Sequence, residues 1–286
     1  MYETFLLRQT PKGNIEGQHW PAEDPSHVVC IVHGIGEYGG RYDRVATEFN
    51  KAGYAVIAMD LRGHGHSMNR WGHCAPRKNV LDDVSALITY AQLTYKDVPI
   101  ILYGHSMGGN IGLDYRCRGG VNDVPSAYII TAPWIRLVRP IPTALYYLMS
   151  GMSKIKPSLI VSSAVDESKL GNPESVLPYN DNPMVHNKIS ALCAVEGFEI
   201  GRGLERGILP DNGRAKNIPL LLMHGTDDQI CDIQGTARVA ARLEKQGAAI
   251  EYVEWEGLYH EIHNGGPESL GDEVIEKMIR FIGSIS

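Results

Sequence analysis

Short apolar runs and longer helical patterns alternate along most of the chain. The apolar runs predict strands over 27–33, 54–59, 100–104, 124–131, 218–224 and 250–255. Between them, apolar side chains recur at the helical period, most regularly over 79–95. Further helices are expected over 41–52, 110–117 and 268–282, and from the end of the 218–224 strand to residue 246. This order is typical of a mostly parallel sheet with helices on both faces.

Two segments depart from the alternation. Residues 3–8 and 14–20 flank a Pro11-Lys-Gly13 turn, which predicts an antiparallel hairpin. Residues 133–215 are rich in proline and hold only short apolar helical pieces. We therefore predict an α/β fold: a doubly wound, mostly parallel sheet with an antiparallel N-terminal hairpin and an inserted helical cap.

The cap is expected over the C-terminal edge of the sheet, where open α/β sheets bind ligands. This divides the chain into a core, residues 1–132 and 216–286, and a cap, residues 133–215. A length of 286 residues with 43% hydrophobic content suits one such domain with a substantial buried core.

Composition limits the kinds of partner and the cellular location that we expect. A net charge of −6 argues against nucleic acid as a partner. The sequence has no apolar run of the roughly 18 residues that a membrane-spanning helix needs, and its start does not resemble a signal peptide, so a cytoplasmic location is expected. The five cysteines are scattered and lack C-x-x-C spacing, which indicates reduced thiols.

The cap has an unusual distribution of charge. Residues 124–165 contain no acidic residue, yet two basic pairs flank the apolar stretch 140–152; they are Arg136 with Arg139, and Lys154 with Lys156. One interpretation is that the apolar side chains pack onto the core while the cations are solvated. The other is a transient contact of the cap with a membrane or micelle, because basic apolar surfaces bind anionic interfaces.

The stretch from 100 to 117 carries the strongest chemical signal. An apolar run leads into Gly104-His-Ser-Met-Gly108, and a helical pattern follows at once. A G-x-S-x-G motif between a strand and a helix is a nucleophile elbow. Gly104 and Gly108 stand where a Cβ would crowd the strained turn. Ser106 is therefore the candidate nucleophile.

A serine hydroxyl needs a neighbouring base, and in this architecture the partners follow in the order Ser, Asp or Glu, His. The strand at 218–224 runs into Asp227 and Asp228, and the strand at 250–255 is followed by His260 and His263. The motif alone leaves both pairs open. A metal site on the two histidines lacks a third ligand at usable spacing, so no metal or cofactor is expected.

The oxyanion of an acyl-transfer reaction needs two backbone N–H donors. Met107, directly after the nucleophile, is one candidate, and Ile35 in the glycine-rich loop after the 27–33 strand is the other. The same loop also matches the G-x-G-x-x-G dinucleotide motif, with Asp60 about 20 residues later. That alternative leaves the two later loops unexplained. Asp60 and Arg62 are instead expected to brace the oxyanion loop by hydrogen bonds.

Together these segments resemble the α/β-hydrolase superfamily, and within it the monoacylglycerol lipase and lysophospholipase group. The resemblance lies in HGIGEYGGRY at 33–42, DLRGHGHS at 60–67, GHSMGG at 104–109, HGTDDQICD at 224–232 and GLYHEIH at 257–263. It covers both flanks of the cap but not the cap itself.

The resemblance implies roles for individual residues. It assigns the catalytic acid to Asp228 and the base to His260, and it matches Ile35 and Met107 to the oxyanion positions. It also places Glu37, Arg41 and His263 near a glycerol-like head group, although Glu37 and Arg41 equally suit a salt bridge at the start of a helix.

We therefore expect a serine carboxylester hydrolase that cleaves monoacylglycerols or similar single-chain lipid esters through an acyl-enzyme. Within the class, the alternatives are a lysophospholipase or a short-chain or aromatic, feruloyl-type esterase. The alternative from another class is a non-catalytic ligand-binding protein on the same fold.

Overall fold

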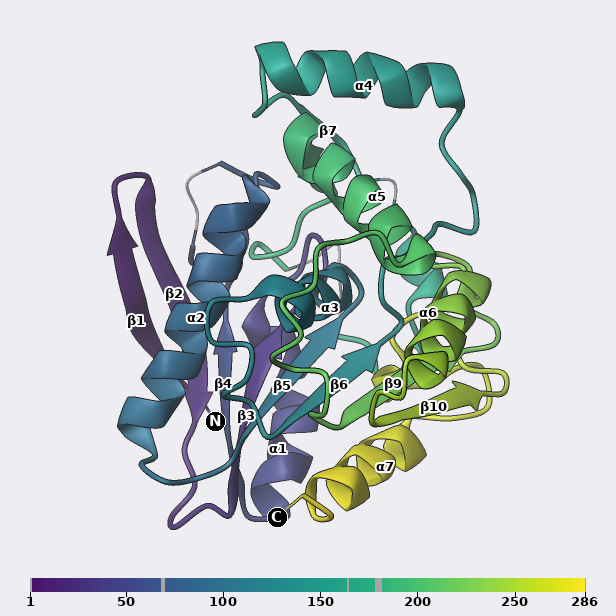
Figure 1. The fold of residues 1–286 in the computed structure, drawn as a ribbon. Helices are drawn as coiled ribbons and strands as arrows, with labels where there is room; N and C mark the ends of the chain where they lie inside the picture. The colour runs from purple at the N-terminus through teal and green to yellow at the C-terminus, as the bar shows by residue number, and fades with distance from the viewer. Residues whose placement is uncertain (1, 68–69, 164, 178–181, 286) are drawn as a thin grey trace.

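The computed structural model describes residues 2–67, 70–163, 165–177 and 182–285. An eight-stranded sheet forms its centre, in the order β1-β2-β4-β3-β5-β6-β9-β10 (Figure 1). Its strands are β1 (Glu3–Thr10), β2 (Gly13–Trp20), β3 (His27–Val32), β4 (Tyr54–Met59), β5 (Ile100–His105), β6 (Ala127–Thr131), β9 (Leu220–Gly225) and β10 (Ile250–Trp255). Strands β1 and β2 pair antiparallel, and β2 pairs antiparallel with β4. The remaining neighbours in the sheet, β4, β3, β5, β6, β9 and β10, pair parallel. The predicted fold class is confirmed.

Helices cover both faces of the sheet, as the apolar strands require. On one face, α2 (Arg77–Thr94), α3 (Met107–Arg118) and α6 (Ile233–Lys245) contribute to one buried apolar cluster. On the other face, α1 (Asp43–Lys51) and α7 (Asp272–Ile282) pack into a second cluster. A one-turn 3-10 helix, η1 (Gly39–Tyr42), precedes α1, and another, η3 (Ile262–Asn264), precedes α7.

Several predicted boundaries differ from the observed ones by a few residues; the helix expected from 110, for example, begins at Met107. The strand expected from 124 begins at Ala127, after Pro125, which has no N–H to donate to a sheet. The last helix, expected from 268, begins at Asp272. Gly266 and Ser269 instead form an isolated antiparallel bridge, and the chain turns into the helix through Gly271 at φ +82°.

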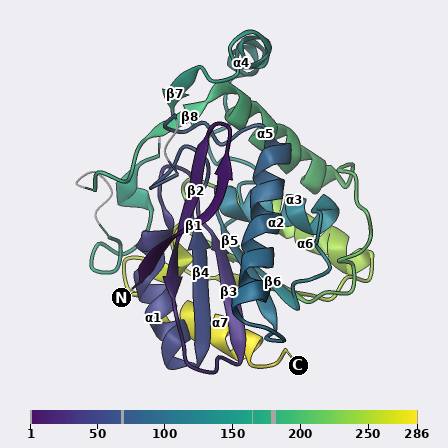
Figure 2. The ribbon, with the colours of Figure 1, turned by 90° about the vertical axis from the view of Figure 1, so that its left-hand side faces the viewer.

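Residues 133–215 hold α4 (Thr143–Ile155), β7 (Ile160–Ser162), η2 (Glu167–Lys169), β8 (Lys188–Ser190) and α5 (Ala191–Arg206). Strands β7 and β8 pair antiparallel, which the sequence pattern did not predict. Both ribbon views show α4 at the far end of the molecule, beyond α5 (Figures 1 and 2). The division of the chain into a core and a cap stays a prediction, and we keep the name cap for these residues.

Helix α5 and helix α4 differ in how deeply they pack. One side of α5 is buried and joins the apolar cluster that covers α3 and α6. In α4, Ser153 is buried, whereas Leu145, Tyr147, Leu148 and Ile155 are 43%, 69%, 62% and 81% exposed. Packing onto the core therefore does not cover these four apolar side chains. Among the described residues, we find no helix with the length and apolar character to cross a bilayer.

Candidate active site

The chain makes a sharp turn at Ser106, between the end of β5 and the start of α3. Ser106 has φ +56° and ψ −116°, a conformation that L-residues rarely adopt. The flanking glycines are required by close backbone contacts: a Cβ on Gly104 would lie 2.4 Å from the Gly108 carbonyl oxygen, and one on Gly108 would lie 1.9 Å from the Val32 carbonyl oxygen. The predicted strand–turn–helix geometry is present, and it places the Ser106 hydroxyl at a helix N-terminus.

Two loops from the same edge of the sheet bring their side chains to Ser106. Nε2 of His260 lies 2.8 Å from Oγ of Ser106, and Nδ1 of His260 lies 2.7 Å from Oδ2 of Asp228. Asp228 follows β9, and His260 follows β10. All three residues are buried. A hydroxyl, an imidazole and a carboxylate in this sequence of contacts can transfer a proton away from the hydroxyl.

The structure separates the two adjacent aspartates. Asp227 is exposed, and its carboxylate accepts from the hydroxyl of Thr226. Oδ1 of Asp228 accepts from the backbone N–H groups of Ile230 at 2.7 Å and Cys231 at 2.9 Å, which fixes the carboxylate and leaves Oδ2 for His260. Only Asp228 can therefore orient the imidazole.

His224 is a site residue that the sequence analysis did not identify. Its Nε2 lies 3.0 Å from Oδ2 of Asp228 and 3.1 Å from the Cys231 carbonyl oxygen. Its Nδ1 lies 2.8 Å from Oγ1 of Thr236, at the start of α6. The sequence feature that could have identified it is its position as the first residue of the HGTDD motif, four residues before Asp228. His224 thus holds the acid from the side opposite the backbone donors.

Electrostatics favour an ionised acid beside a basic imidazole. Burial by itself would raise the pKa of the Asp228 carboxyl, but the charge of His260 and hydrogen bonds from His224 and His260 hold the pKa far below its usual range. Burial would lower the pKa of His260, but the adjacent negative charge of Asp228 outweighs it and raises that pKa. The pair therefore suits a general base whose protonated form is stabilised.

The two predicted oxyanion donors stand on either side of the turn. Met107 is the first residue of α3, so its N–H has no acceptor within the helix. Ile35 lies in the loop that follows β3, and the preceding Gly34 packs against Ser106: a Cβ on Gly34 would lie 3.1 Å from the Ser106 Cβ. Both backbone segments border the hydroxyl. Their function as donors stays a prediction.

Asp60 braces the oxyanion loop, but Arg62 does not. Oδ1 of Asp60 accepts from the N–H of Gly39 at 2.8 Å, and Oδ2 accepts from the N–H of His66 at 2.8 Å and from Nε2 of Gln18 at 3.0 Å. Arg62 instead forms an ion pair with Asp83 on α2, so its predicted role was wrong. Asp60 is fully buried and its oxygens are occupied by protein donors, so it does not face a ribose as the dinucleotide alternative requires.

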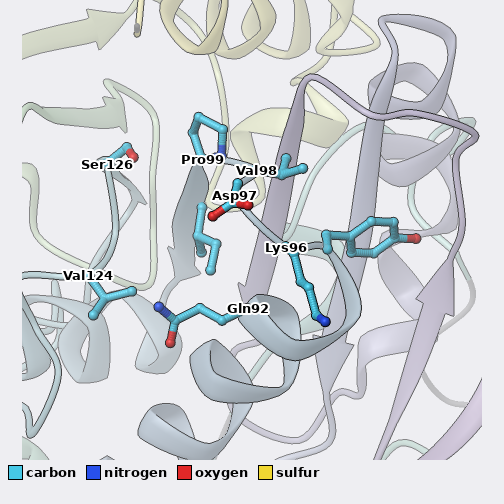
Figure 3. Close-up of a pocket in the computed structure, with 9 residues that line it drawn as sticks. Gln92, Lys96, Asp97, Val98, Pro99, Val124 and Ser126 are labelled. Carbon is cyan, nitrogen blue, oxygen red and sulfur yellow. The ribbon is translucent and has the colours of Figure 1, made fainter.

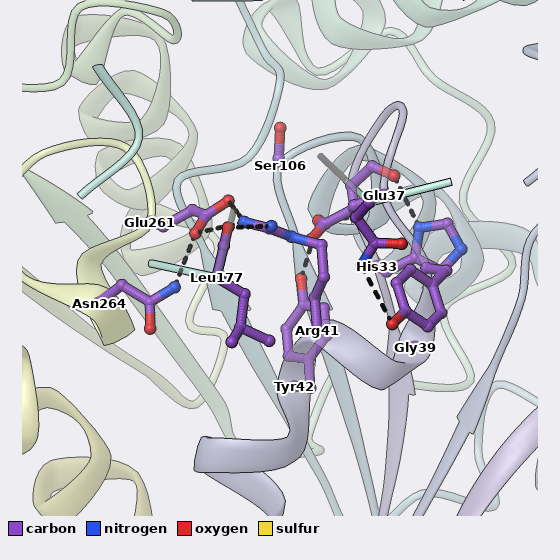
Figure 4. A network of polar contacts seen from close by, with 12 residues as sticks. His33, Glu37, Gly39, Arg41, Tyr42, Ser106, Leu177, Glu261 and Asn264 are labelled. Carbon is purple, nitrogen blue, oxygen red and sulfur yellow. Dashed lines mark hydrogen bonds and ion pairs between the residues drawn. The ribbon is translucent and has the colours of Figure 1, made fainter. Parts of the chain in front are cut away.

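The three residues matched to a head-group site, Glu37, Arg41 and His263, are buried. Figure 4 shows the guanidinium of Arg41 below Ser106, between Glu37 and Glu261. Glu37 and Arg41 form the salt bridge expected at the start of a helix, with Nε and Oε2 3.3 Å apart. The ring of His263 stacks on Tyr42 at a centroid distance of 5.3 Å. Burial and the charges of Arg44 and Arg41 lower the pKa of His263 to about 3, so the ring is neutral. Head-group binding by these residues stays a prediction.

Two cavities lie away from the serine. One, of about 480 Å³, is lined mainly by apolar and aromatic side chains of α4, α5 and the 135–143 segment. The other, of about 460 Å³, lies beside the C-terminal end of α2 and the start of β5, at the opposite edge of the sheet, and is lined by residues that include Gln92, Lys96 and Ser126 (Figure 3). Within the described part of the chain, no cluster of three or more His, Cys, Asp or Glu side chains is arranged to hold a metal ion.

Comparison with known proteins links this geometry to hydrolases. Residues 23–266 match the family described as Hydrolase_4, Serine aminopeptidase, S33. A monoacylglycerol lipase of Mycolicibacterium smegmatis is 30% identical over 251 residues, which are 87% of this chain and 86% of the lipase. Phospholipase YtpA of Bacillus subtilis is 32% identical over 247 residues, which are 86% of this chain and 92% of the phospholipase.

Solved structures show the same fold. A soluble variant of monoglyceride lipase from Saccharomyces cerevisiae, in complex with a substrate analog, superposes with a TM-score of 0.82 at 22% identity, over 100% of this chain and 95% of that chain. A monoacylglycerol lipase of Paleococcus ferrophilus superposes with a TM-score of 0.80 at 26% identity, over 94% of this chain and 99% of that chain.

Proposed function

Because the chain belongs to the α/β-hydrolases of the Serine aminopeptidase, S33 family, we propose that it is a serine hydrolase of monoacylglycerols or similar single-chain lipid esters. The observation that carries the proposal is the hydrogen-bonded line from Asp228 through His260 to Ser106, with contacts of 2.7 and 2.8 Å. The names of the relatives support lipid esters as the substrate class.

In the proposed mechanism, Nε2 of His260 accepts the hydroxyl proton of Ser106 as Oγ attacks the ester carbonyl carbon. Asp228 accepts a hydrogen bond from Nδ1–H and stabilises the imidazolium. The carbonyl oxygen becomes an oxyanion, for which the N–H groups of Ile35 and Met107 are the proposed donors. Collapse of the tetrahedral intermediate breaks the bond to the alkoxy oxygen, which takes the proton from His260 and leaves as the alcohol.

A second half-reaction releases the acid. Water enters where the alcohol left, and His260 removes one of its protons as the oxygen attacks the acyl carbon. The second tetrahedral intermediate expels Oγ of Ser106, which takes the proton back from His260. One ester and one water thus give one alcohol and one carboxylic acid, and the enzyme returns to its starting state.

The cap supports a further part of this proposal, a transient contact with an anionic lipid interface. The four exposed apolar residues lie on α4, which carries Lys154 in its last turn and is followed by Lys156, and the chain has no acidic residue from 124 to 165. A Tyr147→Ser/Leu148→Ser variant should bind less to vesicles containing anionic phospholipid in a co-sedimentation assay, while its hydrolysis of a water-soluble ester stays unchanged. Equal binding of the variant and the wild type would contradict this contact.

Covalent labelling tests the nucleophile. The wild type should react with a fluorophosphonate probe, and mass spectrometry should find the adduct on the peptide that contains Ser106. Ser106→Ala should lose both labelling and esterase activity. Wild-type protein that forms no adduct, or a Ser106→Ala variant with full activity, would favour the non-catalytic ligand-binding alternative.

Substrate series test the lipid preference. Rates for monoacylglycerols with acyl chains from two to eighteen carbons should peak at a long chain. A peak at acetate or at feruloyl esters would overturn the monoacylglycerol proposal. Because one relative is a phospholipase, lysophosphatidylcholine with the same acyl chain is the comparison substrate, and faster cleavage of it would favour the lysophospholipase alternative.

A further inference from the structure

Arg41 is a buried cation that joins three segments far apart in the chain (Figure 4). Its Nε donates to Oε2 of Glu37 at 3.3 Å, in the oxyanion loop. Its Nη1 donates to the carbonyl oxygen of Leu177 at 2.6 Å, in the cap. Its Nη2 donates to Oε1 of Glu261 at 2.9 Å, in the loop that carries His260. One guanidinium therefore contacts the oxyanion loop, the His260 loop and the cap.

The contact with Glu37 leads to the oxyanion loop. Oε1 of Glu37 accepts from the backbone N–H of Gly34 at 2.5 Å and from the hydroxyl of Tyr42 at 3.1 Å. Gly34 directly precedes Ile35 and packs against Ser106. A shift of the Glu37 carboxylate would therefore move the backbone that carries one proposed oxyanion donor.

The contact with Glu261 leads to the general base. Glu261 directly follows His260, and its Oε2 accepts from Nδ2 of Asn264 at 2.7 Å. The backbone N–H of Glu261 donates to the carbonyl oxygen of Leu170 at 2.5 Å, which is a second contact with the cap. The 170–177 part of the cap thus contacts the His260 loop both directly and through Arg41.

Charge makes Arg41 difficult to replace. Burial and the negative charge of Glu261 raise the pKa of Glu37 to about 7, although Arg41 opposes this rise. Burial would raise the pKa of Glu261 as well, but the charge of Arg41 outweighs it and lowers that pKa. The neighbouring Arg44 is directed elsewhere: it donates to the carbonyl oxygen of His263 and to Asp272 on α7. Arg41 is thus the cation that holds both carboxylates.

We infer that Arg41 is a positioning residue, which aligns the oxyanion loop with His260 and makes that alignment depend on the seating of the cap, rather than a ligand of the alcohol. Its Nε, Nη1 and Nη2 each already bind a protein acceptor. The inference rests on the proposed function, since it concerns the same serine and histidine. It differs from head-group binding in predicting that every ester is affected alike.

The test compares Arg41→Lys with the wild type on two esters of the same acyl chain, a 1-acylglycerol and a p-nitrophenyl ester. Lysine keeps the charge but lacks the planar fork that reaches three acceptors. We expect kcat to fall by about 10- to 100-fold on both esters, because misplacing reacting groups by about 1 Å can cost about 100-fold. KM should change by less than about threefold, since the alcohol is not the ligand.

The matched control is Arg62→Lys, which weakens the partly buried arginine–carboxylate pair with Asp83, a pair that includes no residue of the oxyanion loop, the His260 loop or the cap segment 170–177. It should keep wild-type kcat. Unchanged kcat in Arg41→Lys would overturn the inference, and so would a rise in KM confined to the acylglycerol, which is the result for a head-group ligand. An inactive wild type, by contrast, would defeat the proposed function itself.

A second variant covers the case in which Arg41→Lys does not fold. Glu261→Gln keeps Arg41 and the shape of the side chain but removes one of the two carboxylates. Its kcat should fall on both esters, and the rate of fluorophosphonate labelling of Ser106 should fall with it. Wild-type kcat and labelling in folded Glu261→Gln would overturn the inference.

Discussion

Replacing Asp228 by asparagine should invert the hydrogen bonding of His260 while leaving the site in place. Oδ1 of Asp228 is held by two backbone N–H groups, at 2.7 and 2.9 Å. In the variant, the amide oxygen must occupy that position, because an NH₂ group there would face two donors. The NH₂ group then takes the position of Oδ2, 2.7 Å from Nδ1 of His260.

The consequence is a wrong tautomer. An NH₂ group opposite Nδ1 makes that nitrogen the acceptor, so the ring proton moves to Nε2. Nε2 lies 2.8 Å from Oγ of Ser106 and is the atom that must accept the hydroxyl proton. The same inversion in serine hydrolases costs about 10⁴ in kcat, which corresponds to about 5 kcal/mol of transition-state stabilisation.

The assay is the initial rate of hydrolysis of a p-nitrophenyl ester, with the rate of fluorophosphonate labelling as a second measure of the nucleophile. Asp228→Asn should be about 10⁴-fold slower in kcat. The matched control is Asp227→Asn, next in the chain but exposed and outside the line of contacts, which should stay within about twofold of wild type. Circular dichroism checks that both variants are folded. A kcat above a tenth of the wild-type value in folded Asp228→Asn would contradict the role of Asp228 in setting the tautomer of His260.

Three further outcomes follow from the geometry and the charges. Gly108→Ala should destabilise the protein by about 1–3 kcal/mol or prevent folding, because its Cβ would lie 1.9 Å from the Val32 carbonyl oxygen; a melting temperature equal to wild type would contradict this. Gly151→Ala should instead raise the melting temperature by stabilising α4 by up to about 1 kcal/mol, since nothing lies within 4 Å of the new Cβ; a lower melting temperature would be the contrary result. In a pH series, kcat/KM should fall as pH decreases through the pKa of His260, because the base must be neutral, and the midpoint should lie above the ordinary 6.5, since Asp228 raises that pKa; a midpoint below 6.5 would contradict the assignment.

The sequence alone predicted the features that depend on local geometry. The apolar runs gave the strands, and the mostly parallel sheet followed from their alternation with helices. The turn at Ser106 was predictable because Gly104 and Gly108 are needed within two residues of it, and the structure shows the contacts that exclude a Cβ at both positions. The convergence of the three loops on one site was also predictable, because parallel strands bring their C-terminal ends to the same edge of the sheet.

Contacts between segments far apart in the chain are visible only in the folded structure. Asp227 and Asp228 have the same side chain in adjacent positions, so the spacing of the motif left both open. The backbone N–H groups of Ile230 and Cys231, and the contact with His260, 32 residues after Asp228, distinguish them. Arg62 has Asp60 within reach in sequence, yet its bidentate contact with Asp83 on α2 is the one that forms. The exposure of the apolar side chains of α4 also could not be predicted from the sequence, because it depends on how α4 packs against the rest of the fold.

Arg41 makes one contact that the sequence predicted and two that only the folded structure shows. Its spacing from Glu37 predicted a salt bridge within one turn, which is a local property. Its contacts with Leu177 and Glu261 cross 136 and 220 residues of chain. Periodicity and motif spacing describe residues that are close together in the chain. They therefore predicted the local elements and the candidate groups, but not the contacts between distant groups. Folding determined which of those groups lie together in the buried site. Desolvation there makes the pKa of each ionisable group depend on the charges beside it.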